Sequence, residues 1–204
     1  MGKIHGYKQH TLETCGINCL MTALDHFGKE HYIGNSEIMR KERMYYQMYG
    51  ADATEGTLGA AIAYVLSGRG LEVLLVHESE DMLENRGGYF SPEIHQALLK
   101  EHEGWIERAA GAFSVRTGEP ITCDILREEL AREKLLIVQC LIDGNNGIHD
   151  RVMHWIVLYG FENGKFLAGD PLPQGGKIRL TEDELQEYMK TPFGGTYIAV
   201  GRKG

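Results

Sequence analysis

A cysteine stands six positions after a glutamine near the start of the chain, in the segment QHTLETCGINCL (residues 9–20). Cys15 lies where a predicted loop changes into a predicted helix, Gly16 to Phe27. The first turn of a helix offers unpaired backbone N–H groups and the positive end of the helix dipole, and both favour a thiolate over a thiol. Because the thiolate is the nucleophilic form, this position makes Cys15 a candidate for covalent catalysis.

The surroundings of Cys15 add to this interpretation. The apolar residues of the predicted helix form one stripe, and at about 100° per residue Cys15 points roughly opposite its centre. Packing in the main core of its own helix is therefore a weaker explanation for this thiol. Gln9 would bring a side-chain N–H beside the backbone N–H of Cys15, and the two would form a hole for a developing oxyanion. A cysteine near a helix start is nevertheless often only a small buried hydrophobe.

A cysteine nucleophile needs a histidine base, which can come from a distant part of the sequence. His154 precedes the β-rich run WIVLYGF, so a strand would fix its backbone, and Asp170 ends the next predicted strand, KFLAGD. A carboxylate beside the imidazole would fix its tautomer, as in a catalytic triad. His149 is a rival base that we rank lower, because it lies in the polar segment DGNNGIHD. Other histidines, among them His77 and His102, are predicted to be exposed or satisfied.

The register between the two strands decides whether Asp170 reaches His154. Asn163-Gly164 separates the two runs and predicts a β-hairpin turn. A two-residue loop would set His154 opposite Pro173, and a three-residue loop would set it opposite Leu172. Asp170 is then a diagonal neighbour, which a β-bulge could bring closer. The sequence leaves this register open.

Composition narrows the class of protein. The chain has 204 residues, 43% hydrophobic and 25% charged, as expected for one soluble domain spanning 1–204. The formal net charge of −8 argues against nucleic acid or an anionic membrane as the main partner. We see neither a signal peptide nor an apolar run of membrane-spanning length, so we expect a cytoplasmic protein. The oligomeric state is not predicted.

Metal and cofactor chemistry is not expected. The four cysteines show no paired spacing of the kind found in zinc sites or disulfide frameworks. A metal site built from His149, Asp150 and His154 would lack a fourth converging ligand. We therefore predict no cofactor and no metal ion.

The order of the predicted elements indicates an α+β fold. A capping box, Thr181-x-x-Glu184, opens a short helix among the later strands. Helices come first, over about 1–133, and a mostly antiparallel sheet follows, over about 134–204. The other predicted helices cover Gly16 to Phe27, Ser36 to Met48, Thr57 to Leu66, Pro92 to Glu103 and Asp124 to Glu133, and the predicted strands cover 71–77, 135–142, 154–161, 165–170 and 196–200.

Three segments resemble one family in the same order, the bacteriocin-processing, double-glycine-leader cysteine peptidases. The pattern Q-x5-C-G-x-x-C-L is similar to their nucleophile segment, and HWIVLYGFENGKFLAGDP to their histidine–aspartate segment. The stretch from Arg40 to Val76 is similar to a stand-alone, peptidase-like branch. The resemblance implies a papain-like fold with a cleft between its two halves. It also implies Cys15 as nucleophile, His154 as base, Asp170 as its orienting carboxylate and Gln9 in the oxyanion hole.

Two departures from the family are visible. Ile17-Asn18 replaces the small residues or proline common after Cys-Gly, and the chain lacks the transmembrane and ATPase segments of exporter-linked members. Cleavage of leaders during export is therefore not the expected role. We expect a hydrolase acting on a peptide or small amide through a thioester. An acyl or peptidyl transferase with the same three residues, and an inactive papain-like binding module, are the alternatives.

Overall fold

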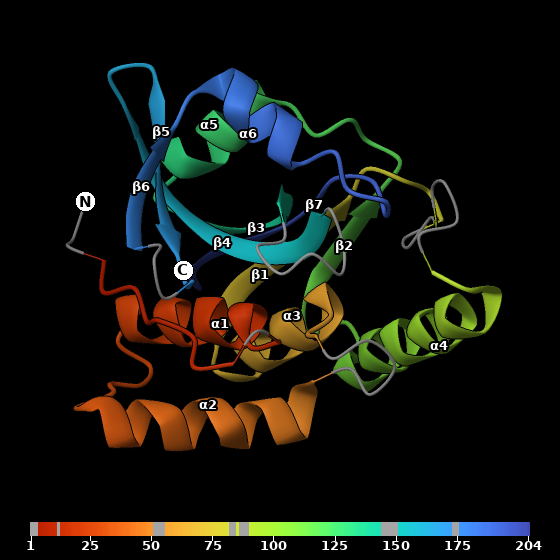
Figure 1. The fold of residues 1–204 in the computed structure, drawn as a ribbon, viewed down its shortest axis with the longest axis horizontal. Helices are drawn as coiled ribbons and strands as arrows, with labels where there is room; N and C mark the ends of the chain where they lie inside the picture. Colours follow the sequence, from red (N-terminus) through yellow and green to blue (C-terminus); the bar gives the residue numbers. More distant parts are fainter. Residues whose placement is uncertain are drawn as a thin grey trace.

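The computed structural model describes residues 4–11, 13–50, 56–81, 85, 90–143, 151–172 and 176–204. Helices and strands within these ranges appear in Figure 1. The helices are α1 (Cys15–His26), α2 (Asn35–Tyr49), α3 (Gly59–Gly68), α4 (Pro92–Ala109), α5 (Cys123–Ala131) and α6 (Glu182–Tyr188). The strands are β1 (Leu71–His77), β2 (Ser114–Thr117), β3 (Leu135–Asp143), β4 (Arg151–Glu162), β5 (Lys165–Asp170), β6 (Gly176–Leu180) and β7 (Thr196–Arg202).

The strands form one sheet in the order β2-β1-β7-β3-β4-β5-β6. Only the β1–β2 pair is parallel among the described pairs, and the other pairs are antiparallel. Helices α1 to α4 lie on one side of this sheet, and α5 and α6 lie on the other (Figure 1). Each side has its own cluster of buried apolar residues. The predicted α+β class, with helices first and a mostly antiparallel sheet after them, is confirmed.

The boundary near residue 133 is less sharp than the sequence suggests. β1 and β2 come from the first part of the chain, yet both belong to the single sheet. The strands β2 and β6 are absent from the prediction, because each is short and half of its residues or more are exposed or partly exposed. The capping box is present, with the Thr181 hydroxyl and the Glu184 carboxylate bonding each other's backbone N–H groups.

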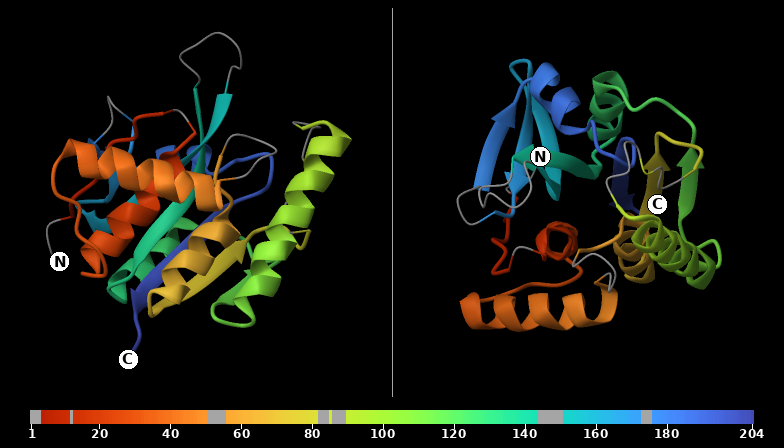
Figure 2. Two further views of the ribbon diagram at one scale, coloured as in Figure 1. Left: turned by 90° about the horizontal axis from the view of Figure 1, so that it is seen from below. Right: turned by 45° about the vertical axis from the view of Figure 1, so that its right-hand side comes forward.

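Helix α1 is covered on all sides. Residues 15–24 are all buried, and Figure 2 shows α2 lying outside α1, on the side away from the sheet. The face that carries Cys15 and Cys19 packs on β4, where the Cys19 thiol donates to the Trp155 carbonyl at 3.3 Å. The expectation that Cys15 faces away from the main core of its own helix is therefore wrong, because Cys15 belongs to the same buried apolar cluster as Ile17 and Leu20. A second packing surface, the sheet, covers the face opposite the apolar stripe.

Gly16 permits this close packing of α1 on β4. A Cβ atom at Gly16 would lie 2.9 Å from Thr57 Cβ and 3.1 Å from Trp155 Cδ1. The Trp155 indole N–H also donates to the Thr57 carbonyl at 3.0 Å, so the ring is fixed in place. Any side chain at position 16 would push the start of α1 away from β4.

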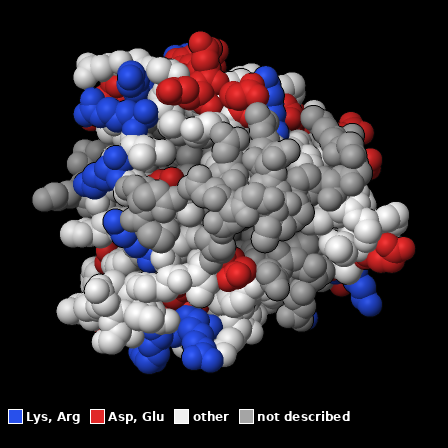
Figure 3. Space-filling model, in the orientation of Figure 1, with Lys and Arg blue, Asp and Glu red and all other residues white. Residues whose placement is uncertain are grey.

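Acidic side chains gather at the end of the molecule that carries α5 and α6 (the top of Figure 3). The first turn of α6 alone contains Glu182, Asp183 and Glu184. No helix in the described ranges has the length and the apolar character that crossing a bilayer requires.

Two buried histidines face each other beside β7. His77 and His102 are each 1% exposed, and their ring centroids are 5.0 Å apart. His77 Nδ1 lies 3.2 Å from Thr196 Oγ1. Within the described part of the chain, His77 Nε2 and both ring nitrogens of His102 have no hydrogen-bond partner. The prediction that these histidines are exposed or satisfied is therefore wrong for His102, and half wrong for His77.

This pair should make the fold sensitive to acid. Burial lowers the pKa of His77 to about 3, helped by the neighbouring His102, and it lowers the pKa of His102 to about 4. Unfolded histidines titrate near pH 6.5, so the unfolded chain takes up protons first as the pH falls. We expect the free energy of unfolding to drop between pH 7.5 and 5, by on the order of 2 kcal/mol per histidine. Urea titration of the wild type and of His102→Phe at both pH values measures the free energy of unfolding. Between pH 7.5 and 5 this free energy should fall less in the variant than in the wild type. Equal losses in the two proteins would contradict this account.

Candidate active site

Cys15 is the first residue of α1 and is 6% exposed. The first turn of α1 contains no acidic residue, and the N-cap residue, Thr14, makes no side-chain capping bond. Neither a carboxylate within that turn nor a capping hydroxyl therefore competes for the positive end of the helix. The thiol lies where the helix start favours a negative charge, as the sequence predicts.

His154 and Asp170 are joined by a hydrogen bond of 2.8 Å between Nε2 and Oδ1. Their strands are linked by the predicted turn, with Asn163 and Gly164 both at positive φ. A bulge at Tyr159 then shifts the register between Leu158 and Gly160.

The bulge settles the register that the sequence leaves open. Val157 pairs with Gly169 and Leu158 with Ala168. Continued toward the start of β4, this register sets His154 opposite residue 172, as the three-residue alternative requires. Asp170 is therefore a diagonal neighbour of His154, close enough to bond its ring.

His154 also interacts with Cys15. Since Nε2 is bonded to Asp170, the nitrogen left for the thiol is Nδ1. Burial alone would lower the pKa of His154. The hydrogen bonds to Asp170 and Cys15, together with their charges, raise that pKa to about 9. At neutral pH the imidazole therefore holds a proton, with the Asp170 carboxylate on one side of the ring and Cys15 on the other.

Asp170 is held as the anion. Burial acts to raise the pKa of its carboxyl, but the bond to His154 and the charge of that ring outweigh burial, and the pKa is lowered. The Leu172 backbone N–H also donates to Asp170 Oδ1, at 2.9 Å. The backbone that follows Asp170 thus helps to orient its carboxylate toward His154.

Gln9 is anchored to the same segment. Its backbone N–H donates to the Pro171 carbonyl at 2.7 Å, and the residue is 3% exposed. Pro171 directly follows Asp170, so the segment before α1 lies against the end of β5. The structure therefore brings Gln9 to the strand that carries Asp170, and His154 to Cys15. The rival base His149, and Asp150 with it, lie outside the described residues.

Two further thiols lie close by. Cys140 pairs across the sheet with His154, and Cys19 lies one turn after Cys15 on α1. Burial raises the pKa of both, that of Cys19 well above the ordinary value, and the charges of Cys15 and Asp170 add to the effect. Both thiols therefore remain protonated. Across the described ranges, no three His, Cys, Asp or Glu side chains gather as a metal-binding group would.

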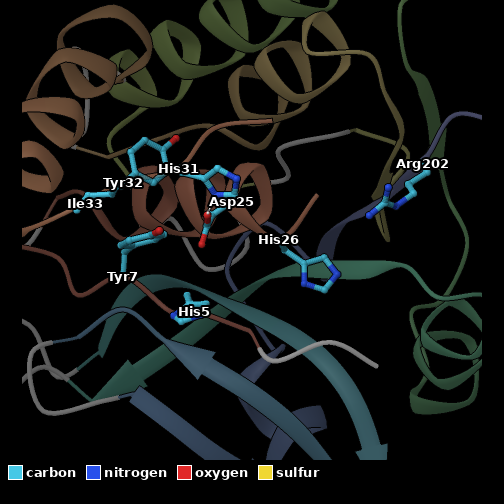
Figure 4. Close-up of a pocket in the computed structure, with 8 residues that line it drawn as sticks. All are labelled: His5, Tyr7, Asp25, His26, His31, Tyr32, Ile33 and Arg202. Atoms are coloured by element: carbon cyan, nitrogen blue, oxygen red, sulfur yellow. Dashed lines mark hydrogen bonds and ion pairs between the residues drawn. The ribbon is translucent and has the colours of Figure 1, made fainter. Parts of the chain in front are cut away.

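A separate pocket of about 600 Å³ lies beside the far end of α1 and contains none of the four predicted residues. Figure 4 shows its lining, in which Asp25 and His31 point toward each other and bond at 2.6 Å. The lining residues are His5, Tyr7, Asp25, His26, His31, Tyr32, Ile33 and Arg202.

Known proteins share this architecture. A profile described as "Peptidase_C39 like family" matches residues 4–191. The peptidase domain of Streptococcus ComA, a bi-functional ABC transporter involved in quorum sensing, is 15% identical, with a TM-score of 0.52 over 98% of this chain and 100% of that one. A double glycine motif protease from an AMS/PCAT transporter, in complex with its leader peptide, is 14% identical, with a TM-score of 0.49 over 98% and 92%. No curated protein matches. The likeness to the ComA domain confirms the predicted papain-like fold.

Cys15 should be the most reactive thiol of the chain. Burial raises the pKa of Cys19, Cys140 and Cys123, whereas Cys15 combines a helix start with a charged histidine. Limiting iodoacetamide at pH 7, followed by peptide mapping, should label Cys15 first. His154→Ala should slow this labelling roughly 10- to 100-fold, as expected for the loss of a hydrogen bond between charged groups. First labelling at Cys19 would overturn the assignment.

Proposed function

The chain belongs to the Peptidase_C39 like family, and from this membership we propose that it is a cysteine peptidase or amidase that forms a thioester on Cys15. One observation carries the proposal. His154 is hydrogen-bonded to Asp170 on one side and interacts with Cys15, the first residue of α1, on the other. A thiol, an imidazole and a carboxylate that adjoin in this order are what a catalytic triad requires, and this supports the proposal.

The first half of the reaction forms the thioester. The Cys15 thiolate attacks the carbonyl carbon of the substrate, and the carbonyl oxygen takes up the negative charge. The backbone N–H of Cys15 and the side-chain amide of Gln9 donate to this oxyanion. His154 then gives its proton to the leaving amine, and the C–N bond breaks.

The second half releases the acid. His154, now neutral, takes a proton from a water molecule, whose oxygen attacks the thioester carbonyl. The C–S bond breaks, the carboxylic acid leaves, and the Cys15 thiolate and His154 imidazolium are restored. Asp170 stays ionised throughout and stabilises the charged ring.

A peptide is the substrate class that family membership favours. The formal net charge of −8, with acidic groups gathered over α5 and α6, favours neutral or basic peptides over acidic ones (Figure 3). A transferase would form the same thioester and pass it to an amine. Product analysis with an added amine separates the two outcomes, because only a transferase gives mainly the amide adduct.

The pH dependence of peptide cleavage tests this proposal. A peptide library should yield a substrate that the wild type cleaves and Cys15→Ala does not. For that substrate, kcat/KM should fall as the pH rises through about 9, because His154 then loses the proton it gives to the leaving group. Asp170→Asn should move this limb to lower pH by about one unit or more, since Asp170 raises the pKa of His154.

The matched control is Asp124→Asn, which changes a carboxylate on α5 with a side chain 75% exposed. Its pH profile should overlay that of the wild type. An alkaline limb that Asp170→Asn leaves in place would show that Asp170 does not act through His154. Equal cleavage by Cys15→Ala would refute the nucleophile itself.

A further inference from the structure

A carboxylate from α2 lies buried beneath the loop that joins Gln9 to Cys15. Glu42 is 2% exposed, although α2 is otherwise a mostly exposed, polar helix. Its Oε1 accepts from the backbone N–H of His10 at 2.9 Å, from the Asn18 side-chain amide at 2.9 Å and from the Thr14 hydroxyl. Its Oε2 lies 2.5 Å from His10 Nδ1. One side chain thus makes four polar contacts, all of them to the segment 10–18.

These contacts flank both halves of the proposed oxyanion hole. His10 directly follows Gln9, and Thr14 directly precedes Cys15. Asn18, one turn into α1, also donates to the Thr14 carbonyl at 3.0 Å. Glu42 therefore contacts the residue next to each group, His10 beside Gln9 and Thr14 beside Cys15.

Packing alone does not account for a carboxylate at this place. Removing a charge from water is costly, and a buried apolar residue would join α2 to α1 at least as well. A buried carboxyl group is retained with least cost where several donors converge on it, as they do here. What the carboxylate adds over an apolar residue is the geometry of the loop.

The loop is also tied to the triad. The backbone N–H of Gln9 donates to the carbonyl of Pro171, the residue after Asp170. Glu42 holds this loop from the α2 side, and Pro171 holds it from the β5 side. Gln9 is thus positioned between two fixed elements.

We propose that Glu42 is a positioning residue, whose contacts with His10, Thr14 and Asn18 set the Gln9 side chain and the Cys15 backbone N–H at the spacing that an oxyanion needs. This inference rests on the proposed function, in which those two groups stabilise the oxyanion. It gives a role to Asn18, whose amide in the segment CGINC is a donor to the buried carboxylate.

A double-mutant cycle on cleavage tests the proposal. Gln9→Ala should lower kcat about 100- to 1000-fold, the usual effect of losing one oxyanion donor. Glu42→Gln should lower kcat roughly 10- to 100-fold with little change in KM, because it misplaces that donor without touching the ground state. In the Gln9→Ala background the same change should lower kcat clearly less than it does alone, since only the Cys15 backbone N–H is then left to misplace.

Alkylation and a control variant separate positioning from folding. Iodoacetamide forms no oxyanion, so Glu42→Gln should alkylate at Cys15 within about threefold of the wild-type rate. Glu129→Gln changes another buried carboxylate, ion-paired with Lys134 on the other side of the sheet, and should leave kcat unchanged. Where Glu42→Gln does not fold, Thr14→Val, which deletes the hydroxyl that bonds Glu42, is compared with Thr14→Ser, which keeps it. The Val variant should lose kcat and the Ser variant should retain most of it.

The outcomes separate this inference from the proposed function. If the wild type shows no turnover that depends on Cys15, the proposed function fails, and this inference fails with it. If the wild type turns over but the costs of Gln9→Ala and Glu42→Gln multiply, only the positioning role of Glu42 is overturned. A parallel fall of alkylation and kcat in Glu42→Gln would also overturn it, because Glu42 would then support the thiolate or the fold.

Discussion

The close approach of α1 to β4 at Gly16 and Trp155 is the contact on which the proposed site depends. Gly16 follows Cys15, and Trp155 follows His154. The packing of Gly16 against Trp155 therefore sets the distance between Cys15 and His154. The absence of a side chain at position 16 lets Trp155 and Thr57 reach the helix backbone. The Cys19 thiol adds a bond from α1 to the Trp155 carbonyl. A helix that begins anywhere else on the sheet would leave His154 without a thiol.

The same buried environment gives neighbouring groups different charge states. Burial keeps the thiols of Cys19 and Cys140 protonated by raising the pKa of each. Burial alone would also keep His154 uncharged, but its interactions with Asp170 and Cys15 raise its pKa despite burial. His154 and Asp170 are therefore both charged, and the low dielectric around them makes their mutual attraction strong.

Local pattern predicts much of this arrangement. The apolar period of α1, the β-rich runs of β3 and β4 and the Asn163-Gly164 turn are all signals contained within a few residues. The bulge at Tyr159 is different, because one extra residue in a strand leaves no mark on composition yet decides the partner of Asp170. Burial of the Cys15 face was mispredicted for a related reason, since the period of a helix does not reveal a second packing surface. His102 and Glu42 were missed because their neighbours come from distant segments.

In the proposed reaction, Cys15 carries the acyl group of the substrate between two chemical steps. The direct measurement is an acid quench during turnover of a cleavable peptide ester, followed by intact-mass analysis and peptide mapping. We expect a mass increase equal to the acyl part of the substrate, located on the peptide that contains Cys15. Hydroxylamine should remove it, and Cys15→Ala should not show it. Release of product with no acyl group on Cys15 during steady turnover, when deacylation has been slowed by low pH, would contradict the proposed reaction.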